Sequence, residues 1–128
     1  PIFHNFDKAP TPVAPFSHAV ESDGWIQLTG QMPTHPDDDS APLADGVKAQ
    51  TRRVMDNLVI VLEGLDLDLS NVLSCRVYLT EFARDYEAMN QTYRSYFSQD
   101  RLPARTCIGV TGLARCALVE IDMVARRP

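Results

Sequence analysis

The segment from Ala117 to Ala125 alternates between two kinds of side chain, and this alternation constrains the fold more than any other feature of the sequence. Successive side chains of a β-strand point to opposite faces of a sheet. The residues that would share one face are Ala117, Val119, Ile121, Met123 and Ala125, all apolar. Those on the other face would be Leu118, Glu120, Asp122 and Val124. The chain must therefore build a sheet that has one face in a core and a second, mixed face.

Four other segments favour strands of the same sheet. Phe16–Glu21 and Trp25–Thr29 flank the turn Ser22–Gly24, which predicts a hairpin. Val72–Thr80 and Arg105–Thr111 are rich in β-branched residues and alternate in polarity. In the third segment, the residues expected on the apolar face are Leu73, Cys75, Val77 and Leu79.

Two segments have helical periodicity. From about Leu43 to Glu63, apolar residues recur at steps of three, four and seven, and Gly64 is a natural end. From about Ala83 to Ser98, one face carries an aromatic stripe that we interpret as core packing. The stripe consists of Tyr86, Met89, Tyr93 and Phe97. These elements together predict an α+β fold, a mixed sheet with both helices packed on its apolar face.

Composition limits the possible function. The 128 residues fit one domain, residues 1–128, and a net charge of −5 without a basic stripe argues against a nucleic-acid partner. The start of the chain has neither a signal peptide nor a long apolar run, so we expect no membrane association. The three cysteines lack metal-like spacing, which favours a reduced, cytoplasmic protein without a metal. The acidic run Asp37–Asp39 lacks the remaining ligands of a calcium loop and is interpreted as a solvated loop.

The mixed face of the sheet predicts an assembly. It would carry Trp, Tyr, Leu and Val beside charged side chains, which is too apolar for bulk water and too charged for a closed core. Such faces are usually covered by another copy of the chain, so we expect a homo-oligomer.

Arg105, in the stretch LPARTCIG, is the most informative charged residue. Its strand places Arg105 and Cys107 on one face, and Glu120 can lie close to Arg105 if the last strand is its neighbour. A desolvated guanidinium needs a partner, since burying it alone costs several kcal/mol. Either Arg105 and Glu120 form a structural ion pair at a subunit interface, or Arg105 holds a substrate carboxylate while Glu120 handles a proton or a water. The spacing alone leaves both interpretations open.

Several motifs, taken in order, resemble those of the RidA (YjgF) family of small trimeric enamine/imine deaminases. The resemblance covers nearly the whole chain. The matching stretches are APFSHAV (14–20), TGQMP (29–33), Gln50 with Asn57-Leu58, VYLTEF (77–82), Asn90 with Tyr93 and Phe97, LPART (102–106) and LVEIDMVA (118–125). Each stretch is weak alone, and their order and intervals make the signal specific.

The resemblance implies a chorismate-mutase-like fold and a homotrimer whose subunits join through their open sheet faces, with active sites in the clefts between them. It implies hydrolysis of reactive 2-enamino or 2-imino acids, of the 2-iminobutanoate and 2-iminopropanoate type, to 2-oxo acids and ammonia, without a metal or organic cofactor. Arg105 would bind the substrate carboxylate and Glu120 would position and activate the water. The other residues that the resemblance implies around the substrate are Phe16, Ser17, Gly30, Gln31, Asn90 and Cys107.

The chain departs from the family pattern at two positions. Phe16 stands where the family usually has a tyrosine, which removes a hydroxyl donor near the expected substrate. His18 stands where glutamine is frequent. His18 could carry a proton, although a lone strand histidine is more often a hydrogen-bonded structural residue.

Three alternatives remain. The trimer could be a non-catalytic protein that binds 2-oxo acids or acts as a chaperone, whereas a ribonuclease-like role conflicts with the acidic charge. Pro1 could be a catalytic amine, as in small trimeric tautomerases; that chemistry needs an immediate buried strand, and removal of an initiator methionine explains Pro1 more simply. Cys107 could be a nucleophile activated by the nearby cation, but the hydrolysis implied above needs no covalent step.

Overall fold

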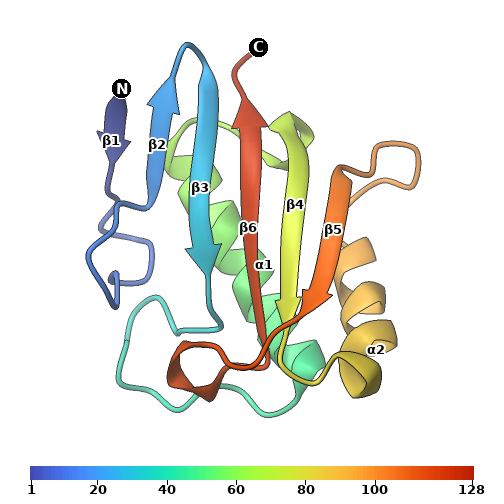
Figure 1. Cartoon of the computed structure of the whole chain (residues 1–128). Coiled ribbons are helices and arrows are strands. Elements are labelled where there is room, and N and C mark those ends of the chain that lie inside the picture. Colours follow the sequence, from blue (N-terminus) through green and yellow to red (C-terminus); the bar gives the residue numbers. More distant parts are fainter.

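The computed structural model describes all 128 residues and contains one six-stranded sheet (Figure 1). Its strands are β1 (Ile2–His4), β2 (Ala19–Ser22), β3 (Trp25–Gln31), β4 (Val72–Leu79), β5 (Ala104–Gly109) and β6 (Val119–Arg126). Their order across the sheet is β1-β2-β3-β6-β4-β5. Only β4 and β5 are parallel, and every other neighbouring pair is antiparallel. The sheet is therefore mixed, as the sequence predicts.

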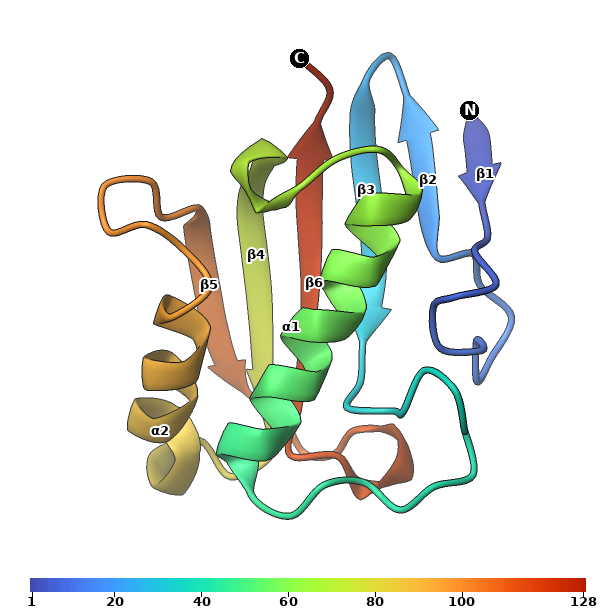
Figure 2. The same ribbon diagram turned by 180° about the vertical axis from the view of Figure 1, so that it is seen from behind.

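Two helices cover one face of this sheet. Figure 2 shows α1 (Val47–Gly64) and α2 (Phe82–Arg94) on the same side, with the other face bare. Two short 3-10 turns, η1 (Leu69–Asn71) and η2 (Ala114–Cys116), precede β4 and β6. The α+β prediction is confirmed. No helix of the chain has the length and apolar character that crossing a bilayer requires.

Both helices are shorter than the periodicity predicts. We expected α1 to begin near Leu43, but Gly46 precedes it in the left-handed region, with φ 84°. The predicted end of α1 at Gly64 is correct. The second helix ends at Arg94 instead of Ser98, because the backbone N–H groups of residues 95–97 bond three residues back and tighten the chain into turns.

The predicted hairpin is confirmed as β2–β3. Ser22 pairs with Trp25, which leaves Asp23 and Gly24 as a two-residue turn with φ 54° and 80°. Two positive φ angles are the signature of the type I′ turn that matches strand twist, and an Asp-Gly pair favours it. The first strand of the hairpin begins at Ala19 instead of Phe16.

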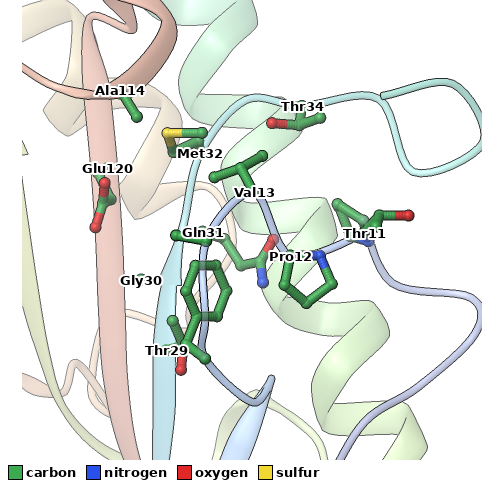
Figure 3. A pocket seen from close by; sticks show the side chains of 13 residues that line it. Thr11, Pro12, Val13, Thr29, Gly30, Gln31, Met32, Thr34, Ala114 and Glu120 are labelled. Carbon is green, nitrogen blue, oxygen red and sulfur yellow. The ribbon is translucent and has the colours of Figure 1, made fainter. Parts of the chain in front are cut away.

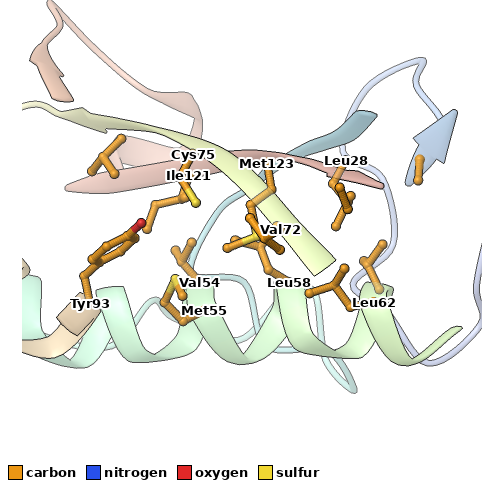
Figure 4. Close-up of a cluster of buried hydrophobic side chains, with 14 of the residues drawn as sticks. Leu28, Val54, Met55, Leu58, Leu62, Val72, Cys75, Tyr93, Ile121 and Met123 are labelled. Atoms are coloured by element: carbon orange, nitrogen blue, oxygen red, sulfur yellow. The ribbon is translucent and has the colours of Figure 1, made fainter. Parts of the chain in front are cut away.

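The core lies between the sheet and α1. Figure 4 shows Val54, Leu58 and Leu62 of α1 directed at side chains such as Ile121 and Met123 of β6. The alternation of the last strand is confirmed, since the residues predicted on its apolar face are buried, namely Ala117, Val119, Ile121, Met123 and Ala125.

One predicted core residue of β4 is wrong. Leu73 is 45% exposed and Val72 is buried in its place. The register between β4 and β6 shifts between Val72 and Ser74, so an extra residue moves Leu73 off the apolar face. Cys75, Val77 and Leu79 lie in the core as predicted.

The start of the chain forms a strand that we did not expect. β1 follows Pro1 immediately and pairs with β2 at the edge of the sheet. Phe3 in this strand is 65% exposed, so β1 is not the buried strand that a catalytic proline amine needs. Pro1 itself is exposed and lines neither cavity described below.

Candidate active site

Arg105 lies on β5, at the edge of the sheet opposite β1. It pairs in register with Cys75, whose side chain is buried on the helix-covered face. The Arg105 side chain therefore extends on the same side as α2 and not on the bare face. Arg105 and Cys107 share this face, as the alternation predicts.

Two tyrosines of α2 surround the Arg105 guanidinium. Its central carbon lies 5.0 Å from the ring centroid of Tyr93 and 5.9 Å from that of Tyr86, both within the range of cation–π attraction. One guanidinium nitrogen donates a long hydrogen bond of 3.4 Å to the Tyr86 hydroxyl. No carboxylate of the chain forms an ion pair with Arg105. The half-buried cation is thus held by aromatic faces and has unused hydrogen-bond donors.

A cavity of about 310 Å³ opens beside this guanidinium. The residues that line it are Tyr86, Asn90, Tyr93, Arg94, Leu102, Pro103 and Arg105. The side-chain oxygen of Asn90 is buried without a hydrogen-bond partner, whereas the buried Tyr93 hydroxyl lies beside the Cys75 thiol in the core. The cavity therefore offers a polar ligand the free guanidinium donors of Arg105.

The backbone of β5 offers a further donor at this edge. The Val110 N–H donates to the Leu79 carbonyl oxygen at 2.9 Å, so the N–H of every second residue before it also faces β4. The N–H groups of Arg105 and Cys107 consequently face the open edge. Burial raises the pKa of the Cys107 thiol, against the opposing effect of Arg105, which makes a thiolate nucleophile unfavourable.

Glu120 lies on the bare face of the sheet, where it pairs with Tyr78 across β4 and β6. Burial raises the pKa of its carboxyl group, and the negative charge of Asp122 raises it further. Gly30 of β3 gives the carboxylate its space, since a Cβ atom at position 30 would lie 2.2 Å from Glu120 Oε2. The glycine thus lets the Glu120 carboxylate lie close to the β3 backbone, and no backbone angle calls for it.

A second cavity, of about 260 Å³, adjoins Glu120. Figure 3 shows Glu120 on one side, Thr11 and Pro12 on the opposite side, and Val13 and Gln31 between them. The lining residues are Pro10, Thr11, Pro12, Val13, Ala14, Phe16, Thr29, Gly30, Gln31, Met32, Thr34, Ala114 and Glu120. Glu120 is the only charged residue among them, and most of the wall is apolar.

Hydrogen bonds of Gln50 and Arg115 hold the loops beside the Glu120 cavity in place. Gln50 of α1 accepts a hydrogen bond from the Leu118 N–H at 2.8 Å and donates one to the Ala44 carbonyl oxygen at 2.9 Å. Arg115 in η2 donates to the carbonyl oxygens of Asp39 and Ala41 at 2.9 and 3.0 Å. These bonds tie the two loops beside the cavity to each other and to the start of β6.

Two residues of the first motif do not face either cavity. The Ser17 carbonyl oxygen accepts a hydrogen bond of 2.6 Å from the Thr29 hydroxyl, which supports the hairpin. His18 is 3% exposed, and its Nδ1 accepts a 2.9 Å bond from the Phe6 N–H. The proton therefore lies on Nε2, which donates to the Pro10 carbonyl oxygen at 2.8 Å. His18 is a structural residue, in agreement with the simpler of the two predictions.

The expected proximity of Arg105 and Glu120 is wrong within one chain. We assumed that their strands were neighbours, but β4 lies between β5 and β6. Tyr78 of β4 pairs with Glu120 on one side and with Ile108 on the other. Glu120 is therefore level with Ile108, which lies three residues beyond Arg105 along β5. Their backbones are therefore separated by about 10 Å across two strand spacings and about 10 Å along the strands. Their side chains also lie on opposite faces, so the two cannot form an ion pair in a monomer.

The predicted site residues thus form two groups. Phe16, Gly30, Gln31 and Glu120 surround one cavity, whereas Arg105 and Asn90 line the other, with Cys107 beside Arg105 on β5. Tyr86 and Arg94 also line the Arg105 cavity, and the sequence did not single them out for it: Tyr86 was assigned to core packing and Arg94 belonged to no motif. The hydroxyl groups of Tyr86 and Tyr93 in the aromatic stripe of α2 were the available signal of a polar site.

Comparison with known proteins agrees with this architecture. The family model described as Endoribonuclease L-PSP matches residues 6–127. The 3-aminoacrylate deaminase RutC of Acinetobacter baylyi is 34% identical over 119 residues, which are 93% of this chain and 92% of the relative.

Solved structures give the same result. RidA from an Antarctic Psychrobacter bacterium has a TM-score of 0.88 and 28% identity, covering 96% of this chain and 97% of that chain. The YjgF gene product of E. coli has a TM-score of 0.87 and 25% identity, covering 97% of both chains. The fold, the family model and the relatives agree with the motifs in the sequence. The chain belongs to the RidA/YjgF/RutC family.

Proposed function

We propose that the protein is a hydrolytic deaminase that converts reactive 2-enamino and 2-imino acids to 2-oxo acids and ammonia. The observation that carries this proposal is the Arg105 guanidinium, which is half buried between two tyrosine rings and has no carboxylate partner in its own chain. A planar guanidinium with free donors is suited to hold the carboxylate that all 2-imino acids share.

A complete site requires two copies of the chain. Arg105 lies at an open sheet edge and Glu120 lies on the bare face, so a neighbouring copy packed against that face can bring its Arg105 to this Glu120. The homotrimer that the family resemblance implies fits this requirement. Each site would then combine the β5 edge of one subunit with the β3–β6 cavity of the next. A shared site also gives the unpaired guanidinium and the bare face a common explanation.

Hydrolysis proceeds by addition of water to an imine carbon that is already electrophilic. Arg105 holds the carboxylate, helped by the outward N–H of Cys107, while the Glu120 carboxylate takes a proton from the attacking water. The new C–O bond gives a carbinolamine. Glu120 passes that proton to the nitrogen, which becomes an amine. The proton of the new hydroxyl then moves through Glu120 to the same nitrogen, so the C=O bond forms as the C–N bond breaks, and the 2-oxo acid and ammonia leave. Because burial and the charge of Asp122 raise the pKa of the Glu120 carboxyl, this group holds the abstracted proton more readily than an ordinary glutamate before it returns it.

The departures from the family pattern are compatible with this chemistry. Phe16 lines the Glu120 cavity, so it supplies an aromatic wall without a hydroxyl donor. His18 is held by two hydrogen bonds outside both cavities, so proton transfer is left to Glu120.

The test is a coupled assay in which an amino-acid oxidase generates the imine and semicarbazide traps what remains. We expect the wild-type protein to accelerate imine loss and Arg105→Ala to lower kcat/KM by about 100-fold, since a bidentate charged interaction is lost. Arg101→Ala is the matched control, because Arg101 lies outside both cavities. Wild-type protein that binds 2-oxo acids but accelerates no imine would instead establish the non-catalytic role.

A further inference from the structure

A second arginine lines the same cavity as Arg105. Arg94 is the last residue of α2; its side chain is exposed at the cavity rim, and its guanidinium forms neither an ion pair nor a hydrogen bond within the chain. None of the residues around this cavity is acidic. In a chain with 17 acidic and 12 basic residues, a cavity with two unpaired guanidinium groups and no carboxylate is a local excess of positive charge.

The helix end alone accounts for only part of this arrangement. A cation in the last turn of a helix is favourable by about 0.3–1 kcal/mol at an exposed site. A cation at any position of the last turn would gain this interaction, so it does not explain why the arginine lies on the helix face that lines the cavity. The position of Arg94 therefore needs a second explanation.

Spacing along α2 provides one. Tyr86, Asn90 and Arg94 recur every four residues, so they form a row on the helix face that lines the cavity. The row begins at Tyr86, which contacts Arg105, and ends at Arg94. Asn90 stands between them in the row, and its side-chain oxygen is buried beneath the cavity wall.

We propose that the preferred substrates are dicarboxylic 2-imino acids, a substrate class that rests on the deaminase function proposed above. The carboxylate next to the imine binds Arg105, and the distal carboxylate binds Arg94 on the wall of the same cavity. This arrangement pairs both cations with one molecule. A neutral side chain satisfies only the first cation.

The test compares two imino acids that differ in one group. An oxidase that accepts both glutamate and glutamine generates imines whose distal group is a carboxylate or an amide. We expect the wild-type protein to favour the carboxylate by about tenfold in kcat/KM, the size of one charge-assisted contact. Arg94→Gln should bring this ratio close to one. Arg101→Gln removes the same charge outside the cavity and should preserve the ratio.

Each outcome decides between the two proposals. Imine hydrolysis without a carboxylate preference, or a preference that survives Arg94→Gln, overturns the substrate class and leaves the deaminase proposal standing. If no imine is hydrolysed, the deaminase proposal fails, and calorimetric titration with stable 2-oxo acids decides the site. Tighter binding of 2-oxoglutarate than of 2-oxopentanoate, lost in Arg94→Gln, supports a dicarboxylate site, and equal binding overturns it.

Discussion

Replacement of Gly30 by alanine should separate activity from stability. The new Cβ atom would lie 2.2 Å from Glu120 Oε2, 3.0 Å from Cδ and 3.2 Å from Cγ. Ordinary van der Waals contact begins at about 3.4 Å, so the carboxylate oxygen must move by about 1.2 Å. The Glu120 side chain can rotate away, because it makes no hydrogen bond that would hold it in place.

The two consequences have different magnitudes. A displacement of about 1 Å in a catalytic group can cost about 100-fold in rate, so we expect kcat/KM for imine hydrolysis to fall by that factor. Alanine is favoured over glycine in a strand by about 0.5–1 kcal/mol, which offsets the cost of moving one side chain. The melting temperature should therefore stay within a few degrees of the wild-type value.

The coupled imine assay and thermal unfolding measure both consequences in the same preparation. Gly112→Ala is the matched control, because a Cβ atom at that position meets nothing within 4 Å. Gly30→Ala should have little further effect in a Glu120→Gln background, since both changes remove the same group. Full activity in folded Gly30→Ala protein would show that the position of Glu120 does not matter and would refute its role.

Three further changes test other parts of the structure. Asp122→Asn removes the charge that helps to raise the pKa of Glu120, so ionisation becomes easier and the acid limb of the kcat/KM profile should move to lower pH; a fixed limb would contradict the assigned cause. Cys116→Gly should stabilise the protein by about 0.5–1 kcal/mol in chemical unfolding, because Cys116 has φ 56°, and a loss of stability would contradict this. Gly64→Ala should destabilise it by about 1–3 kcal/mol, because the Cβ atom would lie 2.7 Å from the Phe6 ring, and unchanged stability would mean that the ring moves freely.

Local patterns predicted the fold well where one face of an element is buried. The alternation of the last strand and the Asp-Gly turn were sufficient for β6 and for the β2–β3 hairpin, because both signals depend only on neighbouring residues. The placement of Leu73 failed, since a one-residue bulge reverses the faces and leaves no local signature. β1 was missed because its three residues are mostly exposed and its partner, β2, is distant in the sequence.

The candidate site was predicted by resemblance, but its geometry was not. Alternation assigned Arg105 and Cys107 to one face correctly, and it could not say which strand lies beside β5. Strand order depends on long-range pairing, and here β4 separates Arg105 from Glu120. The contact between Tyr86 and Arg105 was missed for a related reason, since the position of an edge arginine over α2 follows from tertiary packing and not from the helical repeat.

The central claim, that Arg105 of one copy works with Glu120 of another, has a direct test in mixed assemblies. Arg105→Ala and Glu120→Gln proteins should each be inactive alone. When the two are unfolded together and refolded in equal amounts, random mixing would give about one site in four with both residues intact, so about a quarter of the wild-type imine hydrolysis should return. A mixture that forms hybrid assemblies yet remains inactive would contradict a shared site.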